Sequence, residues 1–414
     1  MNPTHAATPP AVSPGASPAA SSAGDGRSPV SLWRLLGLFL RIGAIGFGGG
    51  MAVIALMERE LVDERRLMPS DEFLHGVGLS QVLGPFAVNA AFFVGYRRHG
   101  LFGGLASATA FLAPSVAAVI GLSAVYFHYH HVPALADALT GLGPMVIALI
   151  LAAAWSMGRK AVTSWTGAML AAAGLVAGIL KANAVWVLLA AGAVGLLLGR
   201  RGGASPEEPL VPPAASASDG PGSGERIARL LPALAPAGIH SAGSAALLLT
   251  FAKVGLVFFG GGFVLVAILH QELVGTLQWL TPREFLDGVA ISNLTPGPIA
   301  VLATFAGYKL RGVGGALVAT IGLFIPAIVL MSVLSAMYTR LQGSWRLHAF
   351  MSGVGPAVVG LVAGAAVLLW PSGILSWRAF VVMVVALALL VRWRWHPAFV
   401  LAMGVATSVV GWIR

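Results

Sequence analysis

Residues 285–308, FLDGVAISNLTPGPIAVLATFAGY, form an apolar block of transmembrane length that is interrupted at 295–298 (TPGP). Residues 73–96, FLHGVGLSQVLGPFAVNAAFFVGY, have the same pattern, interrupted at 83–85 (LGP). Proline removes a backbone donor and breaks a helix, so each block predicts two short helices. At about 1.5 Å per residue, a fragment of about 12 residues is about 18 Å long and reaches the middle of a bilayer and little further.

The chain is a duplication, because a shift of 212 residues aligns residues 39–144 with residues 251–356 without a gap. Of the 106 aligned positions, 32 are identical, and many of these are glycines, prolines and polar residues that a lipid-facing composition alone would not preserve. They include Gly43 and Gly255, the FGGG motifs at 47–50 and 259–262, Glu60 and Glu272, Glu72 and Glu284, Gly76 and Gly288, Ser80 and Ser292, Gly95 and Gly307, and Pro114 and Pro326. Such self-similarity indicates one structural unit used twice.

The composition excludes an ordinary soluble protein, because 57% of the 414 residues are hydrophobic and 10% are charged. We predict an all-α polytopic membrane protein with two homologous repeats and about 10–12 membrane segments, some of them broken or re-entrant. The predicted divisions are a disordered tail at 1–30, a first repeat at 31–200, a hydrophilic linker at 201–243 and a second repeat at 244–414. The first apolar block of each repeat, 32–57 and 244–269, is predicted as one helix.

Two architectures are compatible with the broken second block. If the block crosses the membrane, each repeat has six spans and the two repeats are parallel; if it is a re-entrant hairpin, each has five spans and the repeats are inverted. The distribution of Lys and Arg over the loops does not distinguish the two arrangements. We favour the hairpin, because inverted repeats whose broken helices meet at the midplane are a recurrent design of carriers.

The charges and the missing cysteines exclude several classes of site. The chain has 25 Lys and Arg against 15 Asp and Glu, and in a membrane protein this excess orients the helices, so no nucleic-acid partner is expected. With no cysteine, disulfides and thiolate metal sites are excluded. Residues 128–131 (HYHH) could suggest a metal site, but the aligned residues 340–343 lack histidine, so a polar loop without metal is predicted. No nucleotide-binding motif occurs, and no cofactor is expected.

The motif at 292–298 (SNLTPGP) and its counterpart at 80–85 (SQVLGP) predict an anion site. The helix that begins after each break presents N–H groups without helical partners and a partial positive charge, a combination that binds anions. The candidate ligands are Ser80, Gln81, Ser292, Asn293, Thr295, Pro296, Gly297 and Pro298. In the alternative interpretation, the polar side chains only satisfy carbonyl groups that the proline kink leaves free.

Arg41 and Lys253 occupy equivalent positions inside apolar sequence, shortly before the two glycine runs. A charge at bilayer depth is costly and normally faces a cavity or a partner, so we expect both cations to attract the anion. The glycines that would allow close approach of the backbone are Gly48, Gly49, Gly50, Gly260, Gly261 and Gly262. In the alternative interpretation, each cation extends to the membrane surface from near its helix end.

Three carboxylates, Glu60, Glu272 and Asp287, are candidates for carrying a coupled proton, because a buried carboxyl group can hold a proton near neutral pH. Glu60 and Glu272 match across the repeats, whereas Asp287 aligns with His75. The charged segment 58–72 mixes acidic and arginine side chains, so its default interpretation is a solvated surface.

With these motifs the chain resembles the chromate ion transporter family in its long, two-domain form. The resemblance rests on FGGG at 47–50 and 259–262, on the motifs at 80–85 and 292–298, and on the Gly-Tyr-basic sequence after each broken block, and it covers both repeats. It implies an inner-membrane secondary carrier, with halves of opposite orientation, that exports chromate and confers chromate resistance, and we expect the proton motive force to drive it. The first repeat departs from the fuller motif, because Leu83 precedes Gly84 and Pro85, so we weight the second repeat for anion binding.

The substrate itself is implied by the resemblance, since chromate and sulfate offer N–H donors similar oxygen geometry and charge. The alternative is therefore a sulfate or other oxyanion carrier, and from another class a membrane-embedded hydrolase or metalloenzyme at 128–131. The expected partners are the oxyanion and the lipid bilayer, and a homodimer is a candidate assembly. No enzymatic activity is expected.

Overall fold

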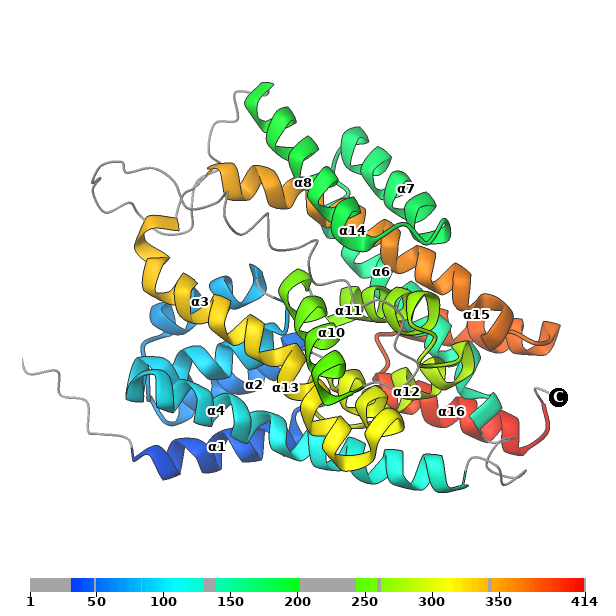
Figure 1. Cartoon of the computed structure of the whole chain (residues 1–414), viewed down its shortest axis with the longest axis horizontal. Coiled ribbons are helices and arrows are strands. Elements are labelled where there is room, and N and C mark those ends of the chain that lie inside the picture. Colours follow the sequence, from blue (N-terminus) through cyan, green and yellow to red (C-terminus); the bar gives the residue numbers. More distant parts are fainter. Residues whose placement is uncertain are drawn as a thin grey trace, which may run out of the picture.

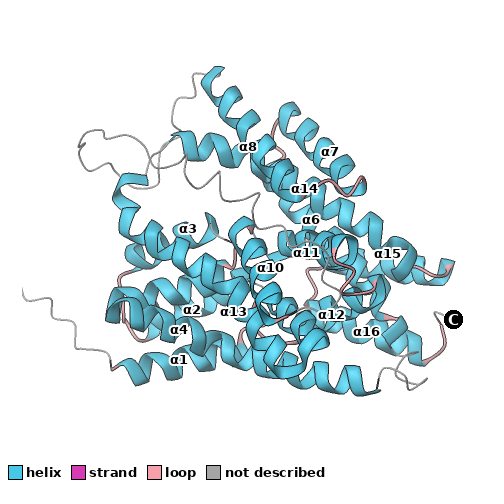
Figure 2. Ribbon diagram, viewed as in Figure 1, coloured by secondary structure: helices cyan, strands magenta, loops and turns pink. Residues whose placement is uncertain are grey.

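The computed structural model describes residues 31–47, 50–82, 84–129, 139–201, 243–258, 262–341 and 345–412. Within these ranges every regular element is a helix (Figures 1 and 2). The predicted tail at 1–30 and nearly all of the predicted linker lie outside the described residues. Four helical segments are long and apolar enough to cross a membrane, namely Phe86–Tyr129, Leu142–Ala161, Ile299–Val333 and Ala349–Gly373. The predicted all-α membrane fold is confirmed.

The two repeats contain equivalent elements in the same order. The first consists of α1 (Leu32–Ile45), α2 (Gly50–Glu58), the π-helical η1 (Arg59–Glu64), α3 (Ser70–Val82), α4 (Phe86–Tyr129), α6 (Leu142–Ala161), α7 (Trp165–Ile179) and α8 (Ala184–Arg201). The second consists of α10 (Ser244–Val257), α11 (Gly262–Leu269), the π-helical η3 (His270–Thr276), α12 (Pro282–Leu294), the 3-10 turn η4 (Ile299–Val301), α13 (Leu302–Leu341), α14 (Trp345–Gly373), α15 (Trp377–Arg392) and α16 (Pro397–Val409). Local backbone agrees as well, since the equivalent residues Arg66 and Gln278 have φ of 50° and 53°.

The first apolar block of each repeat is two helices, so the prediction of one continuous helix at 32–57 and at 244–269 is wrong. Residues 46–49 separate α1 from α2, and residues 258–261 separate α10 from α11. The breaks fall on the FGGG motifs. Glycine costs about 1 kcal/mol relative to alanine inside a helix, so three in succession favour a break over a continuous helix. Each repeat therefore has two broken helices, whereas the sequence predicted one.

The second block of the first repeat is a hairpin. Near the start of α3, Glu72 pairs with Arg97 of α4 at 2.6 Å, and one turn further Gly76 lies against the ring of Phe93. The first part of α4 therefore runs antiparallel to α3, and the chain folds back between Val82 and Phe86. The 13 residues of α3 span about 20 Å at about 1.5 Å per residue, less than the hydrocarbon core of about 30 Å.

The second repeat forms the same hairpin from α12 and the start of α13. Glu284 pairs with Lys309 at 2.6 Å, and Gly288 lies against Phe305, each contact 212 residues after its counterpart. The start of α12 is fixed by a capping box between Thr281 and Glu284. The two hairpins support the re-entrant model over the crossing model.

The long helices α4 and α13 each contain a sharp turn directly after the hairpin. At Gly100 and Gly312 the backbone is left-handed, with φ of 64° and 59°, a conformation that glycine adopts without a steric penalty. Beyond the turn the chain returns along itself, so that Gly95 lies against Gly103. The part that returns continues to Tyr129 and belongs to a segment that is long and apolar enough to cross a membrane.

The repeats are inverted. Helix α6 and the equivalent part of α14 pack against each other, with Gly143 against Gly373 at one end and Ala161 against Gly355 at the other. The contacts run in opposite directions along the two helices, so α6 and α14 are antiparallel. Equivalent helices in parallel repeats would point the same way, so the two-fold relation between the repeats is perpendicular to these helices, as in inverted-repeat carriers.

Cysteine accessibility provides a test of this topology, because the wild-type chain has no cysteine. We expect Arg66→Cys and Arg98→Cys to react with a membrane-impermeant maleimide from one side, and the equivalent Gln278→Cys and Leu310→Cys from the other. Labelling of Arg66→Cys and Arg98→Cys from opposite sides would contradict the hairpin. Labelling of all four from one side would contradict the inversion.

Candidate functional site

Four helix breaks meet between the repeats. The N–H of Gly84, at the tip of the first hairpin, donates to the carbonyl of Phe258 in the second repeat at 3.0 Å. Reciprocally, the N–H of Gly297, at the tip of the second hairpin, donates to the carbonyl of Gly46 in the first repeat at 2.9 Å. Since Gly46 and Phe258 are equivalent positions, each hairpin tip is bonded to the FGGG break of the opposite repeat.

Within each repeat, the FGGG break also contacts the hairpin tip of the same repeat. Gly50, where α2 begins, lies against the ring of Phe86, where α4 begins. In the second repeat, Gly262 lies against Ile299. We refer to the described residues at these breaks, namely 46, 47, 50, 84–86, 258, 262 and 295–299, as the central ring. The candidate ligands Gly48, Gly49, Gly260 and Gly261, and the side chain of Gln81, lie outside the described residues.

Several helices begin at the central ring. Helices α2, α4 and α11 begin there, and η4 leads from it into α13. The first N–H groups of a helix have no partner within the helix, and the helix dipoles add partial positive charge at the same ends. Backbone donors that converge from both repeats can therefore surround a small dianion.

The polar side chains beside the hairpin tips bond to their own helices. The hydroxyl groups of Ser80 and Ser292 donate to the carbonyls of Gly76 and Gly288, at 2.7 and 2.8 Å. The other two bonds run from Asn293 to the carbonyl of Val289 at 2.8 Å and from Thr295 to that of Ser292 at 3.1 Å. These are the bonds expected if the polar side chains only satisfy carbonyl groups of the broken helices. In the conformation described, these donors stabilise the broken ends.

Each intramembrane cation is paired with a carboxylate of its own repeat. Nζ of Lys253 lies 3.0 Å from Glu272, and the guanidinium group of Arg41 lies 3.7 Å from Glu60. Glu60 also accepts a closer hydrogen bond from Arg65, at 3.2 Å. The two pairs occupy equivalent positions. All four residues are candidates by sequence, but nothing in the sequence indicates that they pair. Because Glu60 is only 5% exposed, the expectation of a fully solvated segment at 58–72 is wrong at this residue. The π-helical turn directs its side chain inward.

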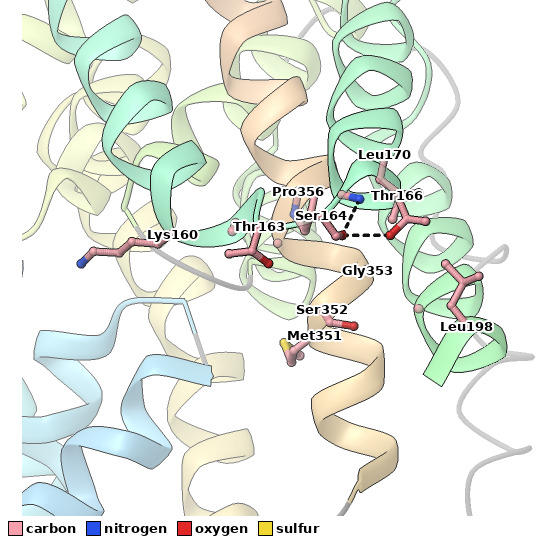
Figure 3. Close-up of a pocket in the computed structure, with 14 residues that line it drawn as sticks. Lys160, Thr163, Ser164, Thr166, Leu170, Leu198, Met351, Ser352, Gly353 and Pro356 are labelled. Carbon is pink, nitrogen blue, oxygen red and sulfur yellow. Dashed lines mark hydrogen bonds between the residues drawn. The ribbon is translucent and has the colours of Figure 1, made fainter. Parts of the chain in front are cut away.

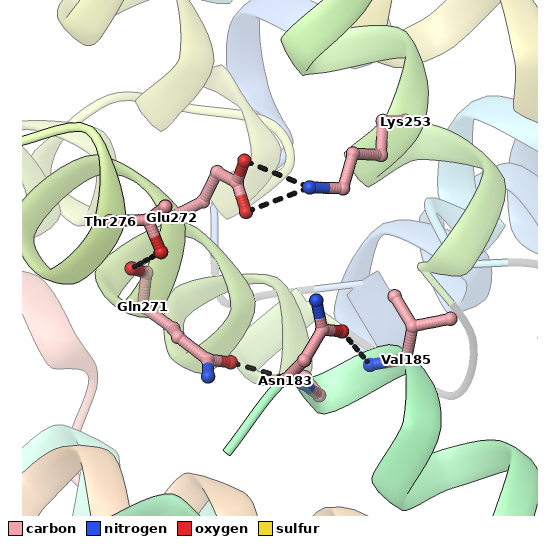
Figure 4. A network of polar contacts seen from close by, with 7 residues as sticks. Asn183, Val185, Lys253, Gln271, Glu272 and Thr276 are labelled. Atoms are coloured by element: carbon pink, nitrogen blue, oxygen red, sulfur yellow. Dashed lines mark hydrogen bonds and ion pairs between the residues drawn. The ribbon is translucent and has the colours of Figure 1, made fainter. Parts of the chain in front are cut away.

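The pair in the second repeat is covered by a loop from the first. Gln271, next to Glu272, donates to the carbonyls of Lys181 (2.8 Å) and Ala182 and accepts from the N–H of Ala184 at 3.1 Å. Figure 4 shows Gln271 reaching this loop while Lys253 and Glu272 face each other above it. A cavity of about 100 Å³ lies among these residues. The network ties the loop between α7 and α8 to the ion pair.

Two further contacts cross between the repeats and were not found from the sequence. Ser115 of α4 donates to the carbonyl of Pro296 at the second hairpin tip, at 2.5 Å. Tyr126, also on α4, donates to Oδ2 of Asp287 at 2.9 Å, and Asp287 is 2% exposed. Arg283 is a second partner of Asp287, at 3.4 Å. Asp287 was a candidate, but its partner Tyr126 is 161 residues away and no sequence spacing connects them.

A larger cavity of about 450 Å³ lies between α6, α7, α8 and α14 (Figure 3). Its hydroxyl groups include Ser164, which caps α7 by accepting from the N–H of Gly167 at 3.1 Å and bonds to Thr166 at 2.9 Å. No residue of the central ring lines it, so this cavity is separate from the helix breaks. Of the 128–131 segment considered for metal, His130 and His131 lie outside the described residues.

Comparison with known proteins identifies the family. The model of the chromate transporter family matches twice, at residues 33–196 and 245–412. A chromate transport protein of Pseudomonas aeruginosa is 34% identical over 82% of this chain and 81% of its own length. A probable chromate transport protein of Synechococcus elongatus is 31% identical, with 86% and 89% covered, and a chromate transport protein of Cupriavidus metallidurans is 30% identical, with 88% and 89% covered. No solved structure matches the chain. The two matches of the family model coincide with the two inverted repeats, and the chain belongs to the chromate transporter family.

Proposed function

We propose that the protein is a secondary active transporter that exports chromate across the inner membrane, driven by the proton motive force, and thereby confers chromate resistance. The observation that carries the proposal is the central ring, where the hairpin tip of each inverted repeat is hydrogen-bonded to the broken helix of the other. The relatives named as chromate transport proteins give the substrate.

In this proposal, chromate binds at the central ring to backbone N–H groups at the beginnings of α2, α4, α11 and η4. Chromate is a tetrahedral dianion, and convergent N–H donors can reach several of its oxygens at once. The described substrate-binding residues proposed from the sequence belong to the central ring or to the helices next to it. Those in the neighbouring helices are Arg41, Ser80, Gln81, Lys253, Ser292 and Asn293. Asn293 and Thr295 contribute when their side chains turn from the helix carbonyls toward the anion.

Alternating access follows from the inversion, because the two ion pairs then lie toward opposite membrane surfaces. The pair Lys253–Glu272 is close and sheltered, with side-chain exposures of 26% and 14%. The pair Arg41–Glu60 is longer, and its arginine is 59% exposed. The closer cation at Glu60 is Arg65, at 3.2 Å, and its side chain is 47% exposed. We propose that the conformation described is closed on the side of Lys253 and more open on the side of Arg41, and that transport exchanges the two states.

The transport proposal is tested in cells that express the chain. They are expected to accumulate less labelled chromate than cells with an empty vector, because the carrier returns the anion to the outside. Equal accumulation at verified expression in the membrane would contradict export. An excess of sulfate that abolishes the difference would assign the site to sulfate-like oxyanions in general, and an unaffected difference would assign it to chromate.

A further inference from the structure

Asp287 differs from the other intramembrane carboxylates in its surroundings. Glu60 and Glu272 each pair with a cation of their own repeat. Asp287 also has a cation beside it, but it is 2% exposed, and its Oδ1 has no hydrogen-bond partner among the described residues. Its Oδ2 accepts from Tyr126 at 2.9 Å and lies 3.4 Å from Arg283. A buried carboxylate with one unsatisfied oxygen is costly as an anion and is relieved by binding a proton.

Asp287 also breaks the symmetry of the repeats. The equivalent position in the first repeat is His75, so one hairpin has the carboxyl group and the other does not. The carboxyl group lies on the second hairpin, and the hydroxyl group it accepts from lies on α4 of the first repeat. An ionised carboxylate accepts a stronger hydrogen bond than a neutral acid, so protonation weakens this contact between the repeats.

The charged and titratable groups around Asp287 are few. On α12 they are Arg283 and Glu284, and Glu284 is held by Lys309 of α13 at 2.6 Å. On η3, the ring of His270 packs edge-on against the ring of Phe285. The remaining titratable groups on α6 and at the start of α16 are Arg159, Lys160 and His396. Arg283 is thus the cation bonded to Asp287, and its side chain is 31% exposed, so that it can leave the carboxyl group when the proton arrives.

We infer that Asp287 is the residue that carries the coupled proton. The hydrogen bond from Tyr126 couples the protonation state of Asp287 to the first repeat. On the outward-facing side the carboxylate of Asp287 takes a proton from water, which neutralises it and loosens the bond from Tyr126. On the inward-facing side it returns the proton to water, and the carboxylate accepts from Tyr126 again. No bond to chromate forms or breaks. This inference rests on the proposed function, and it names the proton carrier within it.

The test uses the purified full chain in proteoliposomes and two assays. Exchange of labelled chromate at equal pH needs no net proton movement, whereas accumulation against a chromate gradient, driven by a pH gradient, does. We expect Asp287→Asn to lower gradient-driven accumulation at least about tenfold while exchange continues, and Tyr126→Phe to move the pH profile of transport upward, since the ionised carboxylate loses a donor. The matched control is Asp71→Asn, an exposed carboxylate on the first hairpin, which should change neither assay.

The outcomes separate the two claims. Gradient-driven accumulation by Asp287→Asn at more than half the wild-type level would overturn the assignment, and so would a pH profile unchanged in Tyr126→Phe. Loss of both exchange and accumulation in Asp287→Asn would also overturn it, because it would show a structural role. Absence of chromate exchange by the wild-type protein would contradict the proposed function itself.

Discussion

Replacement of Gly297 by alanine is expected to reduce chromate transport about tenfold or more without preventing membrane insertion. Gly297 has φ of 99°, and a Cβ atom built on it would lie 2.1 Å from Oγ of Ser115. A left-handed non-glycine residue costs of order 1–3 kcal/mol, which corresponds to about one to two factors of ten in an equilibrium. Alanine would displace the hairpin tip and the bond from Gly297 to Gly46. The measurement is the initial rate of labelled chromate transport at matched protein levels.

The control for this variant is Gly78→Ala. Gly78 lies inside α3 of the first hairpin, and a Cβ atom there would meet nothing within 4 Å. Alanine favours helix over glycine, so this variant should transport at the wild-type rate. The double variant Gly297→Ala with Ser115→Gly removes the steric conflict but leaves the strained backbone, and it should recover only part of the rate. Transport at the wild-type rate by Gly297→Ala would show that chromate transport does not depend on the conformation of the second hairpin tip.

Reversal of the charge at Lys253 should be nearly as damaging. In Lys253→Glu, two carboxylates would lie about where Nζ of Lys253 and Glu272 are now, 3.0 Å apart. Loss of one partner of a partly buried ion pair costs up to about 3–5 kcal/mol, so transport should fall about tenfold or more. The exchanged variant Lys253→Glu with Glu272→Lys restores opposite charges and is expected to recover at least about a third of the rate.

The comparison for the ion pair is Arg59→Ala, which breaks the pair between Arg59 and Glu64. Those side chains are 70% and 44% exposed, and exposed pairs contribute about 0–1 kcal/mol. This variant should transport normally. If the exchanged variant is as inactive as Lys253→Glu, the position requires a lysine for a reason other than the pair, and the proposed closure of this side is wrong.

The sequence was sufficient for the repeat architecture, because duplicated glycines, prolines and carboxylates define the unit independently of lipid-facing composition. It also located the hairpin tips, since proline has a direct effect on helix continuity. It did not locate the breaks at FGGG, because residues 32–57 and 244–269 are apolar throughout and glycine is common in membrane helices. The cost of each glycine is small, and only their succession and the tertiary setting break the helix.

The ion pairs and the hydrogen bonds between repeats could not be predicted from the sequence, for a different reason. Glu60 and Arg41 are 19 positions apart, and so are Glu272 and Lys253, but the turn between them that brings each pair together is π-helical. The bonds from Gly84 to Phe258 and from Tyr126 to Asp287 join different repeats. Contacts of this kind depend on how the inverted repeats face each other, and no periodicity within one repeat encodes that.

We propose that the chain alone moves chromate through the junction of its two inverted repeats. Uptake of labelled chromate into proteoliposomes that contain only the purified full chain, with an imposed pH gradient, tests this proposal. We expect uptake above that of protein-free liposomes. This uptake should collapse when a protonophore removes the gradient and should be reduced about tenfold or more in Gly297→Ala. Uptake equal to that of protein-free liposomes, from correctly inserted protein, would contradict transport by this chain.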